Sequence, residues 1–418
     1  MRILSDMKIK LSFGASFVLS TIIYLVASLF YTLFSIPFTE IIGVILVLTV
    51  IVKIFFLSNI EAFLVICLFF LFLISTYFLL NKDFVDVQIF GLKDSFRFFF
   101  SVLLIITCYD NRFIKSILNF MRRNYQHIYY FLLSLSILNI YFLTQNNCYS
   151  SNWGGSYFIA YSFSNHSCAS SLCLLMSLKL LCLPCFKKVT LIDLSFLVLD
   201  FFMILQTGSR TFVIPSFVVL ILSFRFLRLD IISSYFKYII FCFLPIVILQ
   251  SKFISKLSSS VSEDFFVEKY GLIDTFSNAR LRIWNHNLKS YFEGNWFNIF
   301  IGNGFDFSYI VNNSFLGMKI WAHSDFVSVL VSLGIFGFLL YLIAYITLVS
   351  KIKNKTCICL ICAYTLFPMF FNGFFLYQHL LFSFVFVYCF ITNYEKKLVP
   401  CSSFLKSSFY QTSISTLR

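Results

Sequence analysis

The feature that most constrains this chain is a succession of long apolar segments, separated by short polar connections, along almost its whole length. A helix needs roughly 17–25 such residues to cross about 30 Å of hydrocarbon. Counting segments of that kind predicts about twelve membrane spans. They lie near residues 11–34, 39–57, 60–80, 94–109, 127–145, 156–182, 190–206, 211–226, 235–250, 323–349, 356–376 and 378–393.

Composition predicts the same fold class. Hydrophobic residues make up 60% of the chain and charged residues 12%, with a mean hydropathy of +0.89, which excludes an ordinary soluble globular domain. We therefore expect an all-α, polytopic helical membrane protein. Its predicted organisation is helices 1–9 within residues 1–250, a long outer loop at 251–322, helices 10–12 within 323–393 and a cytoplasmic tail at 394–418.

Basic residues predict the orientation of the spans. If the N-terminus is cytoplasmic, alternate connections carry most of the lysines and arginines, and the opposite short loops carry little beyond Lys82, Lys93 and Arg97. The basic connections contain Arg112, Lys115, Arg122 and Arg123; Lys187 and Lys188; Arg225 and Arg228; Lys351, Lys353 and Lys355; and, in the tail, Lys396, Lys397 and Lys406. The positive-inside rule then places both termini in the cytoplasm. The net charge of +14 follows from this topology, and no nucleic-acid partner is expected.

The N-terminus is expected to be a retained first span, and the cysteines are expected to form neither a disulfide nor a metal site. Lys8 and Lys10 precede the first apolar run without a small-residue cleavage site, which predicts a retained span. Most of the thirteen cysteines fall inside predicted spans, and only Cys148 lies clearly in an outer loop, so no disulfide is expected there. The groups at 182–185 and 357–362 hold too few ligands for a metal site. We expect neither a metal nor a cofactor.

The sequence Thr207-Gly-Ser-Arg-Thr211 separates two apolar spans, so Arg210 is expected at a hairpin tip on the outer face. A guanidinium near hydrocarbon costs several kcal/mol unless an anion or a water-filled cavity receives it. Its planar fork of donors suits phosphate oxygens. Asp200, inside the preceding span, is about 15 Å from Arg210 along a helix and needs another partner or protonation. His166 also lies within or near a span, where an ionisable residue is costly.

The outer loop at 251–322 holds most of the other polar residues that chemistry needs, from Ser258–Ser260, Glu263 and Asp264 onward. Within it, Asn278-Ala-Arg-Leu-Arg-Ile-Trp284 has helical periodicity that continues to about Phe292. Arg280 and Trp284 are four residues apart and share a face, whereas Arg282 points elsewhere. The pair is either a cradle for pyrophosphate and a sugar or an anchor at the membrane surface.

Two further motifs follow. Ile301-Gly-Asn-Gly304 predicts a tight turn around Asn303, which either approaches a ligand or closes the preceding helix. Trp321-Ala-His-Ser-Asp-Phe326 opens the next span, where Ser324 or His323 can cap the helix and Asp325 complements its dipole. His323 can alternatively act as a base or as a hydrogen-bond donor to phosphate. Gly334 and Gly337 favour close helix packing.

In their order, side and spacing these motifs resemble those of the O-antigen polymerase and ligase superfamily, the Wzy-type membrane glycosyltransferases. The resemblance rests on Ser209-Arg210-Thr211, Arg280-x-x-x-Trp284, Gly302-Asn-Gly304, His323-Ser-Asp325 and Gly334-x-x-Gly337, all between about residues 205 and 340. It implies an inner-membrane enzyme that transfers glycan from undecaprenyl pyrophosphate on the periplasmic side without a metal. A chain-length regulator and a flippase are the partner proteins that it implies.

The resemblance also implies roles for individual residues. Arg210 and Arg280 would stabilise the pyrophosphate leaving group, and His323 or Asp325 would accept the proton of the attacking hydroxyl. Ser209, Arg282, Trp284 and Asn303 are the candidate substrate-binding residues around them. Ser324 after the histidine favours a polymerase over a ligase, which transfers finished glycan to lipid A core and commonly has Asn there. A lipid-linked oligosaccharide flippase is the alternative from another class, but it would place its charges along a central cavity within the spans.

The predicted topology is testable by cysteine labelling. A reagent that cannot cross the inner membrane should react with a cysteine introduced at Ser258 and should not reach one introduced at Asn354, because the two sites lie on opposite sides. The reverse pattern would invert the orientation and remove the argument for an outer site.

Overall fold

The computed structural model describes residues 13–31, 73, 85–150, 156–254 and 279–398. The expected spans at 39–57 and 60–80 lie outside these residues, as do Ser258–Ser260, Glu263, Asp264 and the tail beyond residue 398. The described chain is all-α, as the sequence predicts, apart from one short antiparallel pair of strands that the sequence did not indicate.

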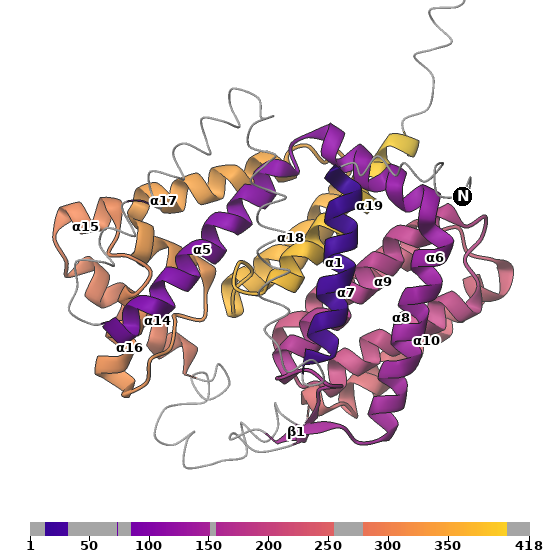
Figure 1. Cartoon of the computed structure of the whole chain (residues 1–418), viewed down its shortest axis with the longest axis horizontal. Coiled ribbons are helices and arrows are strands. Elements are labelled where there is room, and N and C mark those ends of the chain that lie inside the picture. Colours follow the sequence, from indigo (N-terminus) through magenta and orange to yellow (C-terminus); the bar gives the residue numbers. More distant parts are fainter. Residues whose placement is uncertain (1–12, 32–72, 74–84, 151–155, 255–278, 399–418) are drawn as a thin grey trace, which may run out of the picture.

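The helices are α1 (Phe13–Leu29), α5 (Val85–Thr107), α6 (Asn111–Thr144), α7 (Asn165–Cys182), α8 (Leu191–Gln206), α9 (Val213–Phe226), α10 (Ile231–Leu249), α14 (Arg280–Phe292), α15 (Trp296–Ile301), α16 (Phe307–Leu316), α17 (Asp325–Val349), α18 (Lys355–Phe371) and α19 (Gln378–Leu398). Strand β1 (Cys148–Ser150) pairs with β2 (Ser156–Phe158), and 3₁₀ turns occur at η1 (Leu183–Cys185) and η2 (Arg210–Phe212). Figure 1 shows α6–α10 gathered beside α1 and α19, with α14–α16 at the far end of α17 and α5.

Three of the described helical segments are long and apolar enough to cross a membrane: Asn111–Thr144, Asn165–Cys185 and Asp325–Val349. Shorter apolar helices occur at Phe13–Leu29, Ile231–Ile246 and Lys355–Phe371. These segments coincide with predicted spans. The number of about twelve spans goes beyond these three segments of the described chain and stays a prediction.

Several predicted span boundaries are wrong: α5 begins at Val85 and not near residue 94, α18 ends at Phe371 and not near residue 376, and α6 and α7 also begin elsewhere. The helix expected at 127–145 already begins at Asn111, where the carboxylate of Asp110 accepts the N–H of Arg112 at 2.7 Å. The span expected at 156–182 begins as strand β2, and its helix begins only at Asn165, after the hydroxyl of Ser164 accepts the N–H of Ser167 at 3.1 Å. Hydropathy locates the apolar part of a helix, whereas capping side chains decide where the helix begins.

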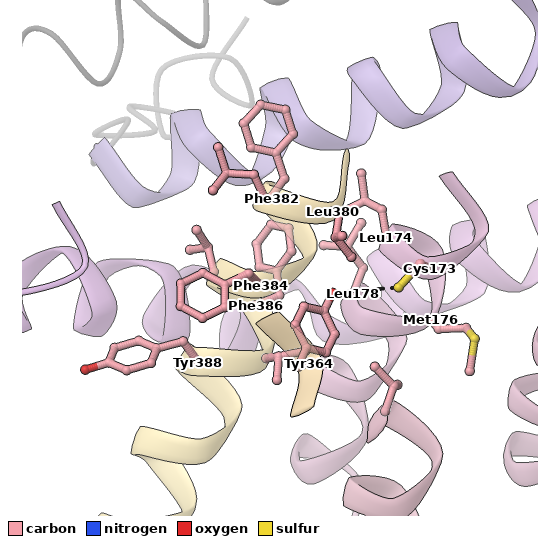
Figure 2. Packing of buried hydrophobic residues seen from close by; sticks show 14 of the residues in the cluster. Cys173, Leu174, Met176, Leu178, Tyr364, Leu380, Phe382, Phe384, Phe386 and Tyr388 are labelled. Carbon is pink, nitrogen blue, oxygen red and sulfur yellow. Dashed lines mark hydrogen bonds between the residues drawn. The ribbon is translucent and has the colours of Figure 1, made fainter. Parts of the chain in front are cut away.

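Helix α7 is the centre of the bundle. Every residue of α7 except His166 is buried, and the helix packs against α19, α8, α6 and α1. Its apolar and small polar side chains are distributed around the whole helix without a distinct polar face, which suits such an interior position. Figure 2 shows its side chains meeting those of α19, with Tyr364 of α18 beside Cys173.

A buried ion pair ties α7 to its neighbours. The ammonium of Lys179 lies 2.8 Å from one carboxylate oxygen of Asp200 on α8, and Ser136 of α6 donates its hydroxyl to the other oxygen at 2.8 Å. All three side chains are fully buried. The sequence predicted that Asp200 needs a partner or protonation. That partner is Lys179, which also lies within a predicted span.

This pair predicts an asymmetric mutational effect. Lys179→Met or Asp200→Leu alone should destabilise the protein by about 3–5 kcal/mol, because each leaves one buried charge without its partner. The double variant should recover most of the loss, since two apolar side chains of similar volume need no partner. Thermal unfolding of the purified protein in detergent measures both effects. A double variant no more stable than either single variant would contradict the assignment.

Candidate functional site

Arg210 lies where the sequence placed it, on the turn between α8 and α9. The turn is held by the beginning of α7, because the Asn165 side-chain amide donates to the carbonyl of Thr207 at 3.1 Å. The Ser209 hydroxyl lies 2.6 Å from Nδ1 of His166, the one residue of α7 that is not buried. The most buried helix of the bundle thus fixes the arginine hairpin.

Arg280 reaches the same region from the outer loop. It is the first residue of α14, and its guanidinium donates to the carbonyl of Phe371 at the end of α18. One turn later, the indole N–H of Trp284 donates to the carbonyl of Ala322 at 2.8 Å, directly before His323. The two side chains share a face, as predicted. Arg282 is two positions from Arg280, so it lies on another face of α14.

The helices α14, α15 and α16 are held against α17 by a small apolar cluster of their own. Its members are Tyr291, Ala322, Val327 and Val331, with Trp284, Leu288, Ile299, Phe307 and Leu330 packed around them. The side-chain amide of Asn287 on α14 donates to Asn312 on α16 at 2.9 Å. The described part of the outer loop is therefore a folded layer that can present Arg280 in a defined position.

Asn372 connects three parts of the site. Its side-chain oxygen lies 3.2 Å from Nδ1 of His323, and its side-chain nitrogen donates to the hydroxyls of Thr211 and Tyr377, both at 2.8 Å. Thr211 follows Arg210 in the hairpin. One buried amide therefore links the histidine, the arginine hairpin and the connection between α18 and α19.

Asp325 is fully buried and faces the backbone of the same connection. One of its carboxylate oxygens accepts the N–H groups of Phe374 at 2.7 Å and of Phe375 at 3.3 Å. Ser324 occupies the N-cap position of α17. This geometry suits Asp325 to holding Asn372 and Tyr377 in place, whereas His323 is the partly exposed group of the two.

The electrostatics of the site combine two cations with a neutral imidazole. Burial lowers the pKa of Arg280 to about 10; nearby Tyr377 opposes the shift and Arg210 adds to it. Burial also lowers the pKa of Arg210, against the influence of Tyr157. Burial, and then the charge of Arg280, lowers the pKa of His323 to about 4, against its bond with Asn372. With these pKa values, Arg280 is charged and His323 is uncharged at neutral pH, the combination that an anion site with a general base would need.

Asn303 belongs to a packing contact. The turn that contains it closes α15, and its N–H donates to the carbonyl of Val331 at 3.0 Å, well inside α17. A Cβ added at Gly302 would lie 2.1 Å from the carbonyl oxygen of Ser332, so only glycine allows this approach. Gly334 kinks α17 at the same place, with φ of 67°. The helix-closing interpretation of this turn is the one that the geometry favours.

Asn372, Tyr377 and Tyr157 belong to the surroundings of the site but were not predicted there, and His166 had no predicted role in it. Residue 372 was placed inside the span expected at 356–376, where a polar asparagine was itself a signal of function. Nothing in the local sequence showed that His166 would meet Ser209, because the two belong to different helices.

Within the described ranges, no three His, Cys, Asp or Glu side chains gather as ligands for a metal ion. No protein-family model matches this chain, and no curated protein or solved structure is significantly similar to it. The interpretation of the site therefore rests on its own chemistry.

Proposed function

We propose that this chain is a multi-pass glycosyltransferase of the bacterial inner membrane. It polymerises undecaprenyl-pyrophosphate-linked oligosaccharide repeat units into O-antigen or a related surface polysaccharide at the periplasmic face. The observation that carries the proposal is the convergence of Arg210, Arg280 and His323 around Asn372, from three regions far apart in the sequence. Two half-buried arginines beside a neutral histidine suit a reaction that transfers a group from a pyrophosphate.

The positions of the site residues along their helices support the proposed topology of about twelve spans. The site takes residues from the beginning of α7, α14, α17 and α19 and from the end of α8 and α18. Basic clusters occur at the opposite ends, as at Arg112 and Lys115 of α6, Arg225 of α9 and Lys355 of α18. In the positive-inside orientation the site therefore faces the periplasm.

The chemistry follows from the geometry. A hydroxyl of the acceptor glycan attacks the anomeric carbon of the donor sugar and forms the new glycosidic bond. The bond from that carbon to the pyrophosphate oxygen breaks, and undecaprenyl pyrophosphate leaves with the electron pair. Arg210 and Arg280 stabilise the charge that develops on this leaving group, which favours the transition state over the ground state. Nε2 of His323 accepts the proton of the hydroxyl.

The two alternative functions are an O-antigen ligase and a lipid-linked oligosaccharide flippase. A ligase would transfer the finished glycan to lipid A core with the same leaving group. A flippase would need charges along a central path, but the buried charge pair between Lys179 and Asp200 is already neutralised by its own contacts. The arginines instead lie at one end of the bundle, which favours the enzyme.

Deleting the gene from its native host separates polymerase from ligase. If the chain is the polymerase, the lipopolysaccharide should carry a single repeat unit, because the ligation of one unit continues. If it is the ligase, the core should carry no repeat and polymer should accumulate on undecaprenyl pyrophosphate. Gel electrophoresis of lipopolysaccharide reads out both patterns. A normal ladder without a redundant gene would exclude both functions.

Substitution of the arginines tests the site. Arg210→Ala and Arg280→Ala should each abolish polymer at unchanged protein levels in the membrane, because each removes a charge that stabilises the leaving group. Lysine should restore activity only in part, since it is a point charge without the forked geometry. His323→Ala should also be inactive, whereas loss of a purely structural cap would cost only about 1 kcal/mol.

Lys289→Ala is the matched control for the arginine variants, because it removes a positive charge from α14 at a side chain that is 68% exposed and outside the site. Its polymer ladder should be close to that of the unmodified protein. Unmodified ladders from both Arg210→Ala and Arg280→Ala would mean that these residues only anchor the hairpin and the loop.

A further inference from the structure

We propose that Asn372 is a positioning residue that holds His323 in the Nδ1–H tautomer and so presents Nε2 as the basic nitrogen. The identity of the hydroxyl that Nε2 deprotonates rests on the proposed function. The tautomer itself depends only on the contacts of Asn372.

In the structure, the orientation of the Asn372 amide sets the direction of each contact. A side-chain amide has two N–H donors and one carbonyl oxygen. The nitrogen of Asn372 gives its hydrogens to the hydroxyls of Thr211 and Tyr377, both at 2.8 Å. Its oxygen is left facing Nδ1 of His323 at 3.2 Å. That oxygen can only accept, so Nδ1 carries the hydrogen and the lone pair of the neutral ring is on Nε2.

Asn372 is itself held rigidly. Its side chain is 2% exposed, and its N–H donates to the carbonyl of Pro368 at 3.0 Å, which ends α18. The two residues after Gly373 are held by the carboxylate of Asp325. A buried amide with fixed backbone on both sides has no freedom to follow a rotating imidazole, so it imposes an orientation on the ring.

The same amide sets the distance between base and leaving-group site. Arg280 donates to the carbonyl of Phe371, the residue before Asn372, and Thr211 is the residue after Arg210. The end of α18 therefore contacts Arg280, the hairpin that carries Arg210, and His323. When Nε2 accepts a proton next to Arg280, the Asn372 oxygen also stabilises the imidazolium through the Nδ1–H that it already accepts.

Nitrogen-15 solid-state NMR of histidine-labelled full-length protein in lipid vesicles reads the tautomer directly. The chain has only five histidines, and the spectrum of His323→Gln assigns the signal of His323 by difference. We expect a neutral ring with hydrogen on Nδ1 at pH 7. Asn372→Leu should produce a mixture of tautomers, because no acceptor then faces Nδ1.

Asn372→Asp provides a second variant that keeps the size and the acceptor. Its carboxylate should raise the titration midpoint of His323 by about 1–3 pH units, since an opposite charge favours the protonated ring. Asn354→Asp is the control: it adds the same charge at the other end of α18, where Asp caps a helix as well as Asn does. The His323 signal should not change in that control.

Activity in membrane preparations gives an independent measurement. Asn372→Leu should reduce the rate of polymer formation about 100-fold through misplacement of the base. Asn372→Asp should retain polymer formation and move its acidic limit to higher pH. A merely structural role would not shift the pH profile.

Two results would overturn the proposal: hydrogen on Nε2 of His323 in the unmodified protein, or an unchanged tautomer in Asn372→Leu. The spectra remain interpretable if the polymerase assignment fails, because they require no substrate. A normal lipopolysaccharide ladder in the deletion strain would refute the proposed function and leave the tautomer measurement intact.

Discussion

In an apolar bundle, a charged or amide side chain is stable only where another polar group pairs with it, and the structure depends on a few such polar contacts. Lys179 and Asp200 neutralise each other between α7 and α8, with Ser136 completing the contact from α6. Asp325 meets two backbone N–H groups, and Asn372 meets three side chains. Most of these contacts join segments that are distant in the sequence, whereas Asn372 and Tyr377 are only five residues apart. The polar groups therefore specify which helix ends come together, while the apolar residues supply most of the burial.

The arginines are stable for a different reason. They lie at the end of the bundle, where Arg210 is on a turn and Arg280 opens a helix of the outer layer. Burial lowers the pKa of Arg280 only to about 10, so it keeps its charge although Arg210 repels it. In the proposed reaction, a pyrophosphate bound by the two arginines would offset the repulsion between their charges.

Much of the helical organisation could be predicted from the sequence, because apolar length is a direct requirement for crossing hydrocarbon. The hairpin of Arg210 and the shared face of Arg280 and Trp284 also followed, since each depends only on local spacing. The beginnings of α6 and α7 did not, because capping by Asp110 and Ser164 outweighed hydropathy. Asn372 could not be placed either: its partners come from three segments, and their meeting is a property of tertiary packing.

The proposed role of His323 as a general base depends on its electrostatic surroundings. Burial lowers the affinity of the His323 imidazole for protons, and the nearby Arg280 cation lowers it further. The pKa of about 4 makes the ring a weak base in the resting site. Negative charge that develops on a leaving group beside Arg280 would reverse this effect at the moment when the proton is transferred. Departure of the pyrophosphate and deprotonation of the acceptor would thus assist each other electrostatically. Asn372 fixes the geometry in which that coupling operates, because one side chain holds both the base and the arginine hairpin.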